Sequence, residues 1–198
     1  MSKVFAQITM SLDGYAAGPN VSVDNPMGDG GERLHYWLSG DGIKTPDAAD
    51  KQVATEMFSN TGAFIVGKTM FDVGIGTWGD DGAFGMPCLV ITHHSKPTLI
   101  KGPTTFSFVT GGIDSALRQA RAAAGDKDIC ILGGPNILQQ YLAARAVDEL
   151  RLDVAPVLLG HGTRLFNNGD TPAEFERVRL LESPLATHMI FRTVSSRA

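Results

Sequence analysis

Hydrophobic residues recur along this chain at two spacings, and each spacing predicts one kind of secondary structure. Short runs that are mostly apolar, or that alternate between apolar and polar residues, predict β-strands. They lie at residues 4–10, 63–67, 88–92, 105–110, 129–132, 149–154, 156–159, 175–181 and 187–194. Apolar residues at helical spacing predict helices at residues 32–38, 47–58, 68–73 and 113–124, and a further helix that begins directly after Gly134.

The order of these elements predicts an α/β fold. Strands alternate with helices over most of the chain, which is typical of a largely parallel sheet covered by helices. The last two predicted strands follow one another around Ser183 and Pro184, which predicts an antiparallel hairpin at the C-terminal edge of the sheet. Residues 18–31 are rich in Gly, Asn, Pro and Asp and predict a surface loop. Because no linker-like segment divides the chain, we expect residues 1–198 to form a single domain.

Composition narrows the classes of partner. The chain has 198 residues, of which 43% are hydrophobic and 19% charged, and these values are ordinary for a globular protein. A net charge of -4 argues against a nucleic-acid partner or an anionic membrane surface, and no apolar run is long enough to span a bilayer. Cys88 and Cys130 lie far apart in apolar runs, which predicts buried free thiols in a reducing compartment. We therefore expect a cytoplasmic protein.

The most informative segment is Gly133-Gly134, because it joins an apolar strand directly to a helix. Glycines let a phosphate approach the backbone, and the N–H groups of the first helical turn point toward it. Pro135 suits that turn, where a missing N–H costs nothing, and Asn136 follows it. This pattern predicts an anion site that could hold a dinucleotide, although a tight turn of purely structural value has the same sequence. The usual Gly-x-Gly-x-x-Gly fingerprint of dinucleotide sites is absent.

Two further loops follow predicted strands and carry groups that bind phosphate. The first is Gly67-Lys68-Thr69-Met70-Phe71, in which the glycine allows a phosphate to approach the backbone, the threonine supplies a hydroxyl and the lysine a positive charge. A capped helix with a solvated lysine explains this segment equally well. Thr92-His93-His94-Ser95-Lys96 follows another strand, at the kind of strand end where ligands bind in open α/β sheets. Its side chains could hold a ribose 2′-phosphate or form a plain polar loop. Adjacent histidines on an extended segment point to opposite faces, which argues against a metal site.

Candidates for acid–base chemistry and for ring stacking are fewer. Asp13 follows the first strand, and a carboxylate there, inside an apolar cleft, would have a raised pKa and could deliver a proton. The alternative is a turn residue that accepts backbone hydrogen bonds. Trp37 and Trp78 could stack on a planar heterocycle, or could serve only in packing. Ser11 and Ser95 have no evident His and Asp partners, so a hydrolase is not indicated.

Six segments, in this order, resemble a known family. They are Ser11-Leu12-Asp13-Gly14-Tyr15, Gly67-Lys68-Thr69-Met70-Phe71, Leu89-Val90-Ile91-Thr92-His93, Ile131-Leu132-Gly133-Gly134, Val147-Asp148-Glu149-Leu150 and Pro156-Val157-Leu158-Leu159-Gly160-His161-Gly162-Thr163-Arg164-Leu165-Phe166. Together they resemble the C-terminal reductase domain of the bifunctional riboflavin-biosynthesis deaminase–reductase, a branch of the dihydrofolate-reductase-like superfamily. The resemblance implies a three-layer α/β fold whose mixed, mainly parallel central sheet has about eight strands. It also implies NADPH as the hydride donor, and a homodimer.

The resemblance also implies roles for the residues of these motifs. It puts the cofactor pyrophosphate at Gly133, Gly134, Pro135 and Asn136, with Gly67 to Thr69 against the phosphates. Met70 is predicted to be a further cofactor-binding residue. Lys68, Thr92 and His93 would lie near the adenosine 2′-phosphate. Ala16 and Ala17 match the segment that passes the nicotinamide, and Asp13 belongs to the same loop.

Two departures from the family pattern matter. The zinc deaminase motifs, His-x-Glu and Pro-Cys-x-x-Cys, are absent from these 198 residues, so we expect a stand-alone reductase module. No clear set of basic residues marks a site for the ribose phosphate of the substrate. Arg33, Lys44 and Arg164 are candidates, with surface charges as the alternative, and Glu32 is the nearest match to the carboxylate on the first helix of dihydrofolate reductases.

The leading hypothesis is an NADPH-dependent reductase that transfers a hydride to a small heterocyclic substrate. The favoured substrate is 5-amino-6-(5-phosphoribosylamino)uracil, an intermediate of riboflavin synthesis. A dihydrofolate- or pterin-type reductase is one alternative, and a non-catalytic nucleotide-binding protein on the same fold is another.

Overall fold

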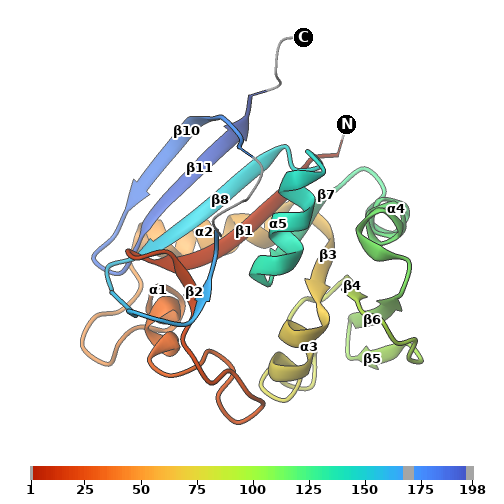
Figure 1. Cartoon of the computed structure of the whole chain (residues 1–198), viewed down its shortest axis with the longest axis horizontal. Coiled ribbons are helices and arrows are strands. Elements are labelled where there is room, and N and C mark those ends of the chain that lie inside the picture. The colour runs from red at the N-terminus through yellow and green to blue at the C-terminus, as the bar shows by residue number, and fades with distance from the viewer. Residues whose placement is uncertain (1, 167–171, 195–198) are drawn as a thin grey trace.

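A nine-stranded sheet forms the centre of the computed structural model, which describes residues 2–166 and 172–194 (Figure 1). The strand order is β10-β11-β8-β1-β7-β3-β4-β6-β5, and the six strands from β8 to β6 are parallel. The bounds are β1 Val4–Ser11, β3 Thr61–Gly67, β4 Pro87–Ile91, β5 Leu99–Lys101, β6 Thr104–Val109, β7 Asp128–Gly133, β8 Glu149–Ala155, β10 Phe175–Glu182 and β11 Thr187–Thr193. The predicted parallel sheet with an antiparallel C-terminal hairpin is therefore confirmed. The antiparallel edge strand β5 was not predicted.

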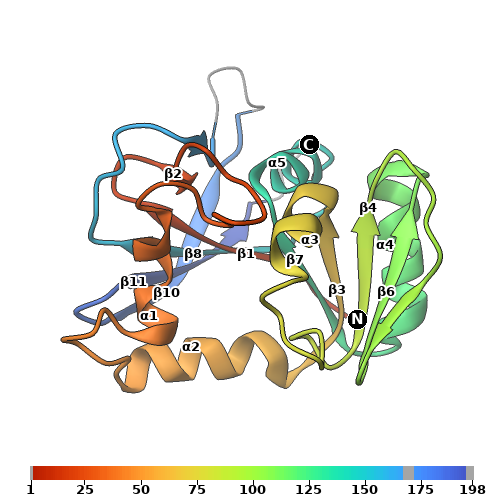
Figure 2. The same cartoon turned by 90° about the horizontal axis from the view of Figure 1, so that it is seen from below.

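Helices cover both faces of the sheet and make it the middle of three layers. On one face lie α4 (Gly112–Ala124) and α5 (Pro135–Ala143), and on the other lie α2 (Ala48–Ser59) and α3 (Lys68–Gly74). Figure 2 shows α2 and α5 on opposite sides of β1 and β8. The short η1 (Gly31–His35) and α1 (Tyr36–Ser39) precede α2 in the chain. Each face of the sheet therefore needs its own buried layer of side chains.

The start of α2 is held by a reciprocal pair of hydrogen bonds. The carboxylate of Asp47 accepts hydrogen bonds from the backbone N–H groups of Ala49 and Asp50. In return, the carboxylate of Asp50 accepts one from the N–H of Asp47 at 2.9 Å. Such a capping box satisfies N–H groups that have no partner within the helix. It sets the position at which Asp50 enters the protein interior.

The two buried layers differ in composition. The layer under α4 and α5 is aliphatic, and α4 contributes Ala116, Ala120 and Ala124 from one side of the helix. The layer under α2 and α3 contains the rings of Phe5, Phe64, Phe71, Phe84 and Phe106 together with Cys88 and Cys130. Both cysteines are buried and unpaired among the described residues, as the sequence predicts.

Several short elements differ from the prediction. Residues 156–159 were expected to form a strand but have no regular structure, since β8 ends at Ala155 and the backbone turns there through a Val157 N–H to Ala155 O hydrogen bond. Two strands that were not predicted, β2 (Tyr15–Ala17) and β9 (Thr163–Arg164), pair with each other as a separate small sheet. Within the described ranges, no helix is both long and apolar enough to cross a membrane.

Candidate active site

A cleft of about 1100 Å³ collects most of the residues that the sequence singles out. Residues from all three predicted strand-end loops line it, as do both tryptophans. The predicted residues in its lining are Ala17, Trp37, Gly67, Lys68, Thr69, Met70, Trp78, Thr92, His93, Gly134, Pro135 and Asn136. Gly133 and Asp13 are outside the lining. This volume of about 1100 Å³ is slightly larger than the range of about 300–1000 Å³ that is usual for one small ligand.

The Gly133-Gly134 turn forms one part of the cleft and leaves room for a ligand. Gly133 has a φ of +124°, which only glycine adopts readily, and a cis peptide bond joins it to Gly134. Gly134 is the N-cap of α5 and makes no side-chain cap hydrogen bond. A Cβ added to Gly134 would meet no atom within 4 Å, whereas one added to Gly67 would lie 3.0 Å from Ile137 Cγ1. The open space in front of an uncapped helix start fits a phosphate group.

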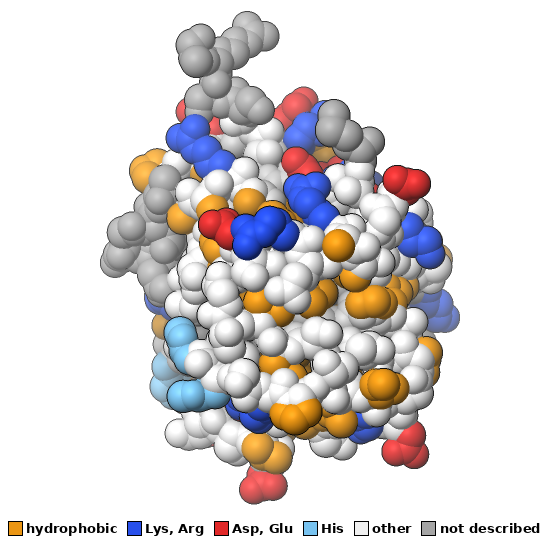
Figure 3. All heavy atoms as spheres, turned by 90° about the vertical axis from the view of Figure 1, so that its right-hand side faces the viewer, with side chains coloured by type: hydrophobic (Ala, Val, Ile, Leu, Met, Phe, Trp, Pro, Cys, Tyr) orange, Lys and Arg blue, Asp and Glu red, His pale blue; other side chains and the backbone are white. Residues whose placement is uncertain are grey.

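Basic groups lie near this part of the cleft. Lys68 lines it and forms an ion pair with Asp72, one helical turn further on. Thr92 is buried, and its hydroxyl oxygen accepts a hydrogen bond from the backbone N–H of His94 at 3.2 Å. The imidazoles of His93 and His94 are exposed, and Figure 3 shows histidine side chains at one margin of the side on which β4, β6 and α4 lie. These side chains supply positive or hydrogen-bonding groups at the solvent boundary.

Aromatic and aliphatic side chains enclose another part of the cleft. Trp37, Met57, Phe58, Trp78 and Phe84 line it, and Trp37 is only 3% exposed. Trp78 stacks on Phe106 at 5.8 Å between ring centroids and packs on Gly74, where a Cβ would lie 2.3 Å from Trp78 Cζ2. Such a surface suits a planar, weakly polar ring.

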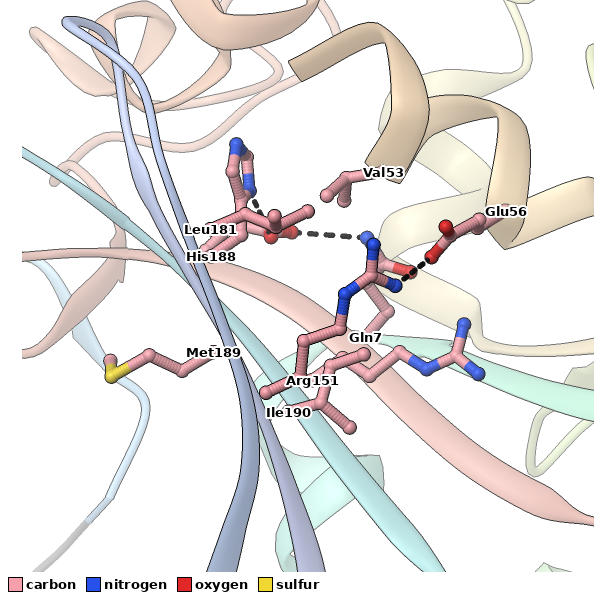
Figure 4. A pocket seen from close by; sticks show the side chains of 10 residues that line it. Gln7, Val53, Glu56, Arg151, Leu181, His188, Met189 and Ile190 are labelled. Carbon is pink, nitrogen blue, oxygen red and sulfur yellow. Dashed lines mark hydrogen bonds and ion pairs between the residues drawn. The ribbon is translucent and has the colours of Figure 1, made fainter. Parts of the chain in front are cut away.

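A row of polar side chains borders this apolar part. Thr9 on β1, Asp153 on β8 and His188 on β11 are register partners on neighbouring strands. The two ring nitrogens of His188 lie 2.7 Å from Asp153 Oδ1 and 3.0 Å from Asp50 Oδ1. Figure 4 shows His188 and Gln7 among the side chains that line a small neighbouring cavity of about 20 Å³. Asp153 Oδ2 accepts a hydrogen bond from Gln7 Nε2 at 3.1 Å, and Thr9 Oγ1 accepts one from Trp37 Nε1. Gln7, Thr9 and Asp153 belong to the lining of the cleft.

The electrostatics of this row follow from burial and pairing. Burial alone would lower the pKa of His188, but its hydrogen bonds and charge interactions with Asp153 and Asp50 outweigh burial and raise that pKa. A protonated His188 donates from both nitrogens, so the two carboxylates act as acceptors. His35, also in the cleft lining, has the opposite behaviour, because burial lowers its pKa despite the charge of Asp153.

The raised pKa expected for Asp13 is wrong. Its carboxylate accepts hydrogen bonds from the Ser11 hydroxyl and from the N–H groups of Leu159 at 3.1 Å and Gly160 at 2.7 Å. These donors, the Ser11 hydroxyl first, lower the pKa of Asp13 to about 2. The carboxylate therefore stays ionised and ties the turn after β1 to the segment after β8, as the alternative interpretation of a turn residue predicted.

Four other candidates are outside the lining of the cleft. Arg33, Lys44 and Glu32 are exposed, and Arg164 lies over the Tyr15 ring at 4.7 Å. Lys68 is the one Lys or Arg side chain that lines the cleft among the residues that the structure describes.

The buried polar row was missed at the sequence level, although a signal was present. Polar residues alternate along the strands at Gln7 and Thr9 and again at Arg151 and Asp153. Such alternation usually indicates a solvent-facing side. Here α2 covers that side, and pairing between strands far apart in sequence satisfies the polar groups.

Comparisons with known proteins agree with this architecture. The family model described as the RibD C-terminal domain matches residues 2–188. No curated protein sequence matches the chain. Among solved structures, a protein from Shewanella sp. PV-4 named for riboflavin biosynthesis superposes with a TM-score of 0.73 at 19% identity, covering 98% of this chain and 99% of the other.

Two further structures broaden the comparison. RibD of Acinetobacter baumannii gives a TM-score of 0.63 at 14% identity, and the 98% of this chain that aligns spans 59% of that protein. Dihydrofolate reductase of Enterococcus faecalis, in a complex with NADP(H), gives a TM-score of 0.60 at 13% identity, with 98% of this chain and 97% of the other covered. At these identities the superpositions show a shared dihydrofolate-reductase-like fold.

Proposed function

The chain belongs to the RibD C-terminal domain family, and from this premise we propose that it is an NADPH-dependent reductase of a small heterocyclic substrate. In this reaction the bound cofactor would supply the hydride. The chain itself would align the two ligands and exclude water from the space between them. The dihydrofolate-reductase-like fold supports this proposal but does not by itself assign an activity.

The observation that carries the proposal is the division of one cleft into two chemically different parts. The open cradle at Gly134 and the start of α5 suits an anionic group. The apolar part, walled by Trp37, Met57 and Trp78, suits a planar ring. A single space of about 1100 Å³ that offers both environments is what a dinucleotide and a heterocycle would need side by side.

We assign the cofactor to the three strand-end loops. Gly67, Thr69, Gly134 and the first turn of α5 would hold the pyrophosphate, with Ala17 beside the nicotinamide. Lys68 and His93 would lie near the adenosine 2′-phosphate, which is the group that distinguishes NADPH from NADH. The structure of the E. faecalis reductase with NADP(H) supports a nicotinamide cofactor on this fold.

The favoured substrate is 5-amino-6-(5-phosphoribosylamino)uracil, since the family resemblance is to the riboflavin-pathway reductase. One observation favours a second candidate. Lys68 is the sole Lys or Arg among the described residues in the cleft lining, and the cofactor would use it. A substrate phosphate would then lack a cation of its own, which favours an unphosphorylated ring of the pterin type. A nucleotide-binding protein without turnover is the remaining candidate.

The proton that accompanies the hydride needs a source other than Asp13. Asp13 lies outside the cleft lining and stays ionised, because hydrogen bonds lower its pKa to about 2. His35 lines the cleft, but its lowered pKa leaves the imidazole neutral at pH 7. We therefore propose that water delivers this proton.

Cofactor binding and turnover test the proposal separately. We expect NADPH to bind more tightly than NADH, with ligand fluorescence as the measurement, and equal affinities would remove only the role of Lys68 and His93. Binding of neither cofactor would contradict the proposal. NADPH oxidation is then followed with pyrimidine and pterin acceptors. Oxidation with at least one acceptor is expected, and binding without oxidation would favour the nucleotide-binding protein.

A leucine at position 134 tests the phosphate cradle. Gly134→Leu should weaken NADPH binding by about a hundredfold, because the new side chain would occupy the space assigned to the phosphate. Gly76→Leu is a matched control, since a Cβ there also meets no atom within 4 Å and Gly76 is outside the cleft lining. Thermal unfolding of both variants checks that folding is retained. An unchanged NADPH affinity in folded Gly134→Leu protein would refute the assignment.

A further inference from the structure

Two buried polar atoms that lack a hydrogen-bond partner belong to residues that line the same small cavity. Within the described ranges, Gln7 Oε1 and Arg151 Nε are the only such side-chain atoms. Both residues line the cavity of about 20 Å³ in Figure 4. A space of this size holds one water molecule, which can donate to the amide oxygen and accept from the guanidinium N–H. One water therefore gives partners to two atoms whose burial would otherwise cost free energy.

The lining of this cavity contains both a surface ion pair and a buried acid–base pair. Arg179 Nη1 lies 2.6 Å from Glu56 Oε2, and these two side chains are 33% and 34% exposed. His188 and Asp153 also line the cavity, and they are only 3% and 2% exposed. A water in the cavity therefore lies between groups that meet solvent and groups that do not.

Asp153 is the member of the buried pair that also lines the large cleft. Its Oδ1 lies 2.7 Å from His188 Nδ1, and His188 is outside the cleft lining. Gln7, which donates to Asp153 Oδ2, is the other residue that lines both spaces. The side chains of Gln7 and Asp153 therefore form part of the wall that separates the cavity from the cleft.

The charges around His188 favour a proton on its ring. Asp153 from β8 and Asp50 from α2 face its two nitrogens, and both raise its pKa. Arg151 lines the cavity beside it, and His35 interacts with the charge of Asp153 from the lining of the cleft. The imidazolium is therefore a proton store that adjoins Asp153.

We propose that protons pass from solvent, chiefly through the water in this cavity, to Asp153 and His188, and from Asp153 into the cleft. The inference rests on the proposed function in that a reductase consumes one proton with each hydride. In each cycle the His188 imidazolium gives its Nδ1 proton to Asp153. The Asp153 carboxyl passes a proton to a water in the cleft, and that water protonates the acceptor. Neutral His188 then regains a proton through Asp153 from the cavity water, which solvent restores.

The position of the cavity water is the first test. A high-resolution crystal structure of the unmodified protein should show one water within about 3.2 Å of both Gln7 Oε1 and Arg151 Nε. An empty cavity would overturn the inference.

Exchange of the two His188 ring protons with water tests the path without any acceptor. Val53 lines the cavity and not the cleft, so the carbon added by Val53→Leu should displace the water. We expect NMR at pH 6 to show exchange slowed by about tenfold, because protons must then await local opening. Leu181→Phe fills the cavity from β10 and should have the same effect.

Thr55→Leu is the matched control for these cavity variants. Thr55 is exposed on α2 and lies outside both linings, so the parent exchange rate should be kept. Thermal unfolding checks that each variant folds. Exchange at the parent rate in both cavity variants would overturn the inference.

Turnover tests whether the reaction uses the path. Single turnovers of NADPH oxidation are followed at several pH values with the pyrimidine or pterin acceptor that supports oxidation. The parent rate should decline as the pH rises and His188 loses its proton. His188→Gln cannot store a proton, so the rate at pH 6 should fall by about a hundredfold and vary little with pH. His161→Gln, exposed and outside both linings, should keep the parent profile, and a parent profile in His188→Gln would overturn the inference.

The two proposals fail in different ways. If no acceptor is reduced while the cavity variants slow the exchange of the His188 protons, the reductase proposal fails and the path from solvent to Asp153 stands. If NADPH is oxidised while exchange and the pH profile are unchanged in the variants, the reductase proposal stands and the inference fails.

Discussion

The same face of the sheet is apolar at one end and polar at the other, although helices bury both ends. We call the first the aromatic half, made by Phe64, Phe71, Phe84, Phe106 and their neighbours between β3 and β6. We call the second the polar half, made by Gln7, Thr9, Arg151, Asp153 and His188 on β1, β8 and β11. Helix α2 contacts both, through Met57 in one and Asp50 in the other.

The two halves avoid the free-energy cost of burying unpaired polar groups in different ways. In the aromatic half, contacts between rings, such as the tilted pair Phe64 and Phe84 at 4.8 Å between centroids, fill space without a buried charge to satisfy. In the polar half, nearly every buried donor or acceptor has a partner, and Gln7 Oε1 and Arg151 Nε are the exceptions among the described residues. Burying paired charges adds little net stability, whereas removing one partner is costly. We therefore expect the aromatic half to stabilise the fold and the polar half to serve the chemistry of the cleft.

The largest loss of stability should come from the aromatic half. Phe64→Ala removes a fully buried ring that contacts Phe58 and Phe84, and leaves a cavity between tightly packed strands. The free energy of unfolding should fall by about 4 kcal/mol. Urea denaturation followed by circular dichroism measures this change. A loss below about 1 kcal/mol would mean that the aromatic half is not the stabilising one.

Removing the side chain of His188, which lies at the centre of the polar half, should lower the free energy of unfolding slightly less. His188→Ala leaves Asp50 and Asp153 buried without the cation between them. The free energy of unfolding should fall by about 3 kcal/mol at pH 6, where the imidazole of the parent protein is protonated. The double variant His188→Ala with Asp50→Ala should lose less than the sum of the two single losses, because it removes a pair. Strict additivity would contradict the proposed pairing.

The contribution of His188 should depend on pH. Its pKa is raised in the folded protein above the ordinary value of 6.5, so the folded state holds the proton more tightly than the unfolded state. The resulting stabilisation is complete below about pH 6.5 and is lost as the pH rises through the raised value. The difference in unfolding free energy between the parent protein and His188→Gln should therefore narrow from pH 6 to pH 9. A difference that widens would reverse the assigned sign.

The last prediction concerns the reactivity of the two thiols in the aromatic half, which we expect to be very low in the native protein. Burial raises the pKa of Cys88 and Cys130, and both lie in the layer that contains Phe64. A chromogenic aromatic disulfide should react with them only when the protein unfolds. Labelling should be about a thousandfold faster in Phe64→Ala, in line with the loss of about 4 kcal/mol. Rapid labelling of the native parent protein would show that this layer opens locally.

Much of the fold was predictable from local pattern. Parallel strands such as β3 and β4 are buried on both faces and therefore appear as continuous apolar runs, and α4 ends at Gly125 where the sequence places its C-cap. The small sheet of β2 and β9 was not predictable in this way. Its two strands are very short, and they pair only because β1 and β8 bring the segments after them together.

The residues of the site could be predicted where they stand close together in the sequence. Gly133-Gly134, Lys68 and His93 stand in short motifs, and the structure brings their loops together around one cleft, while their roles stay predictions. Asp153, His188 and Gln7 belong to three strands that are far apart in sequence, and only the strand order makes them neighbours. For Asp13 the sequence suggested a carboxylate that is free to act as an acid. In the structure this carboxylate accepts hydrogen bonds from the N–H groups of Leu159 and Gly160, which are far away in the sequence.

Asp50 ties the start of α2 to the border of the cleft. One of its oxygens accepts the Asp47 N–H that closes the capping box, and the other contacts His188 beside Asp153. A fluctuation that frays the first turn of this helix must also release the imidazole, and a ligand that holds Asp153 in place must restrain the fraying. Amide hydrogen exchange at the first residues of α2 should therefore slow when a heterocycle binds on the opposite side of His188. Because Asp50 contacts both the helix start and His188, the exchange rate at the start of α2 would show whether a ligand is bound in the cleft.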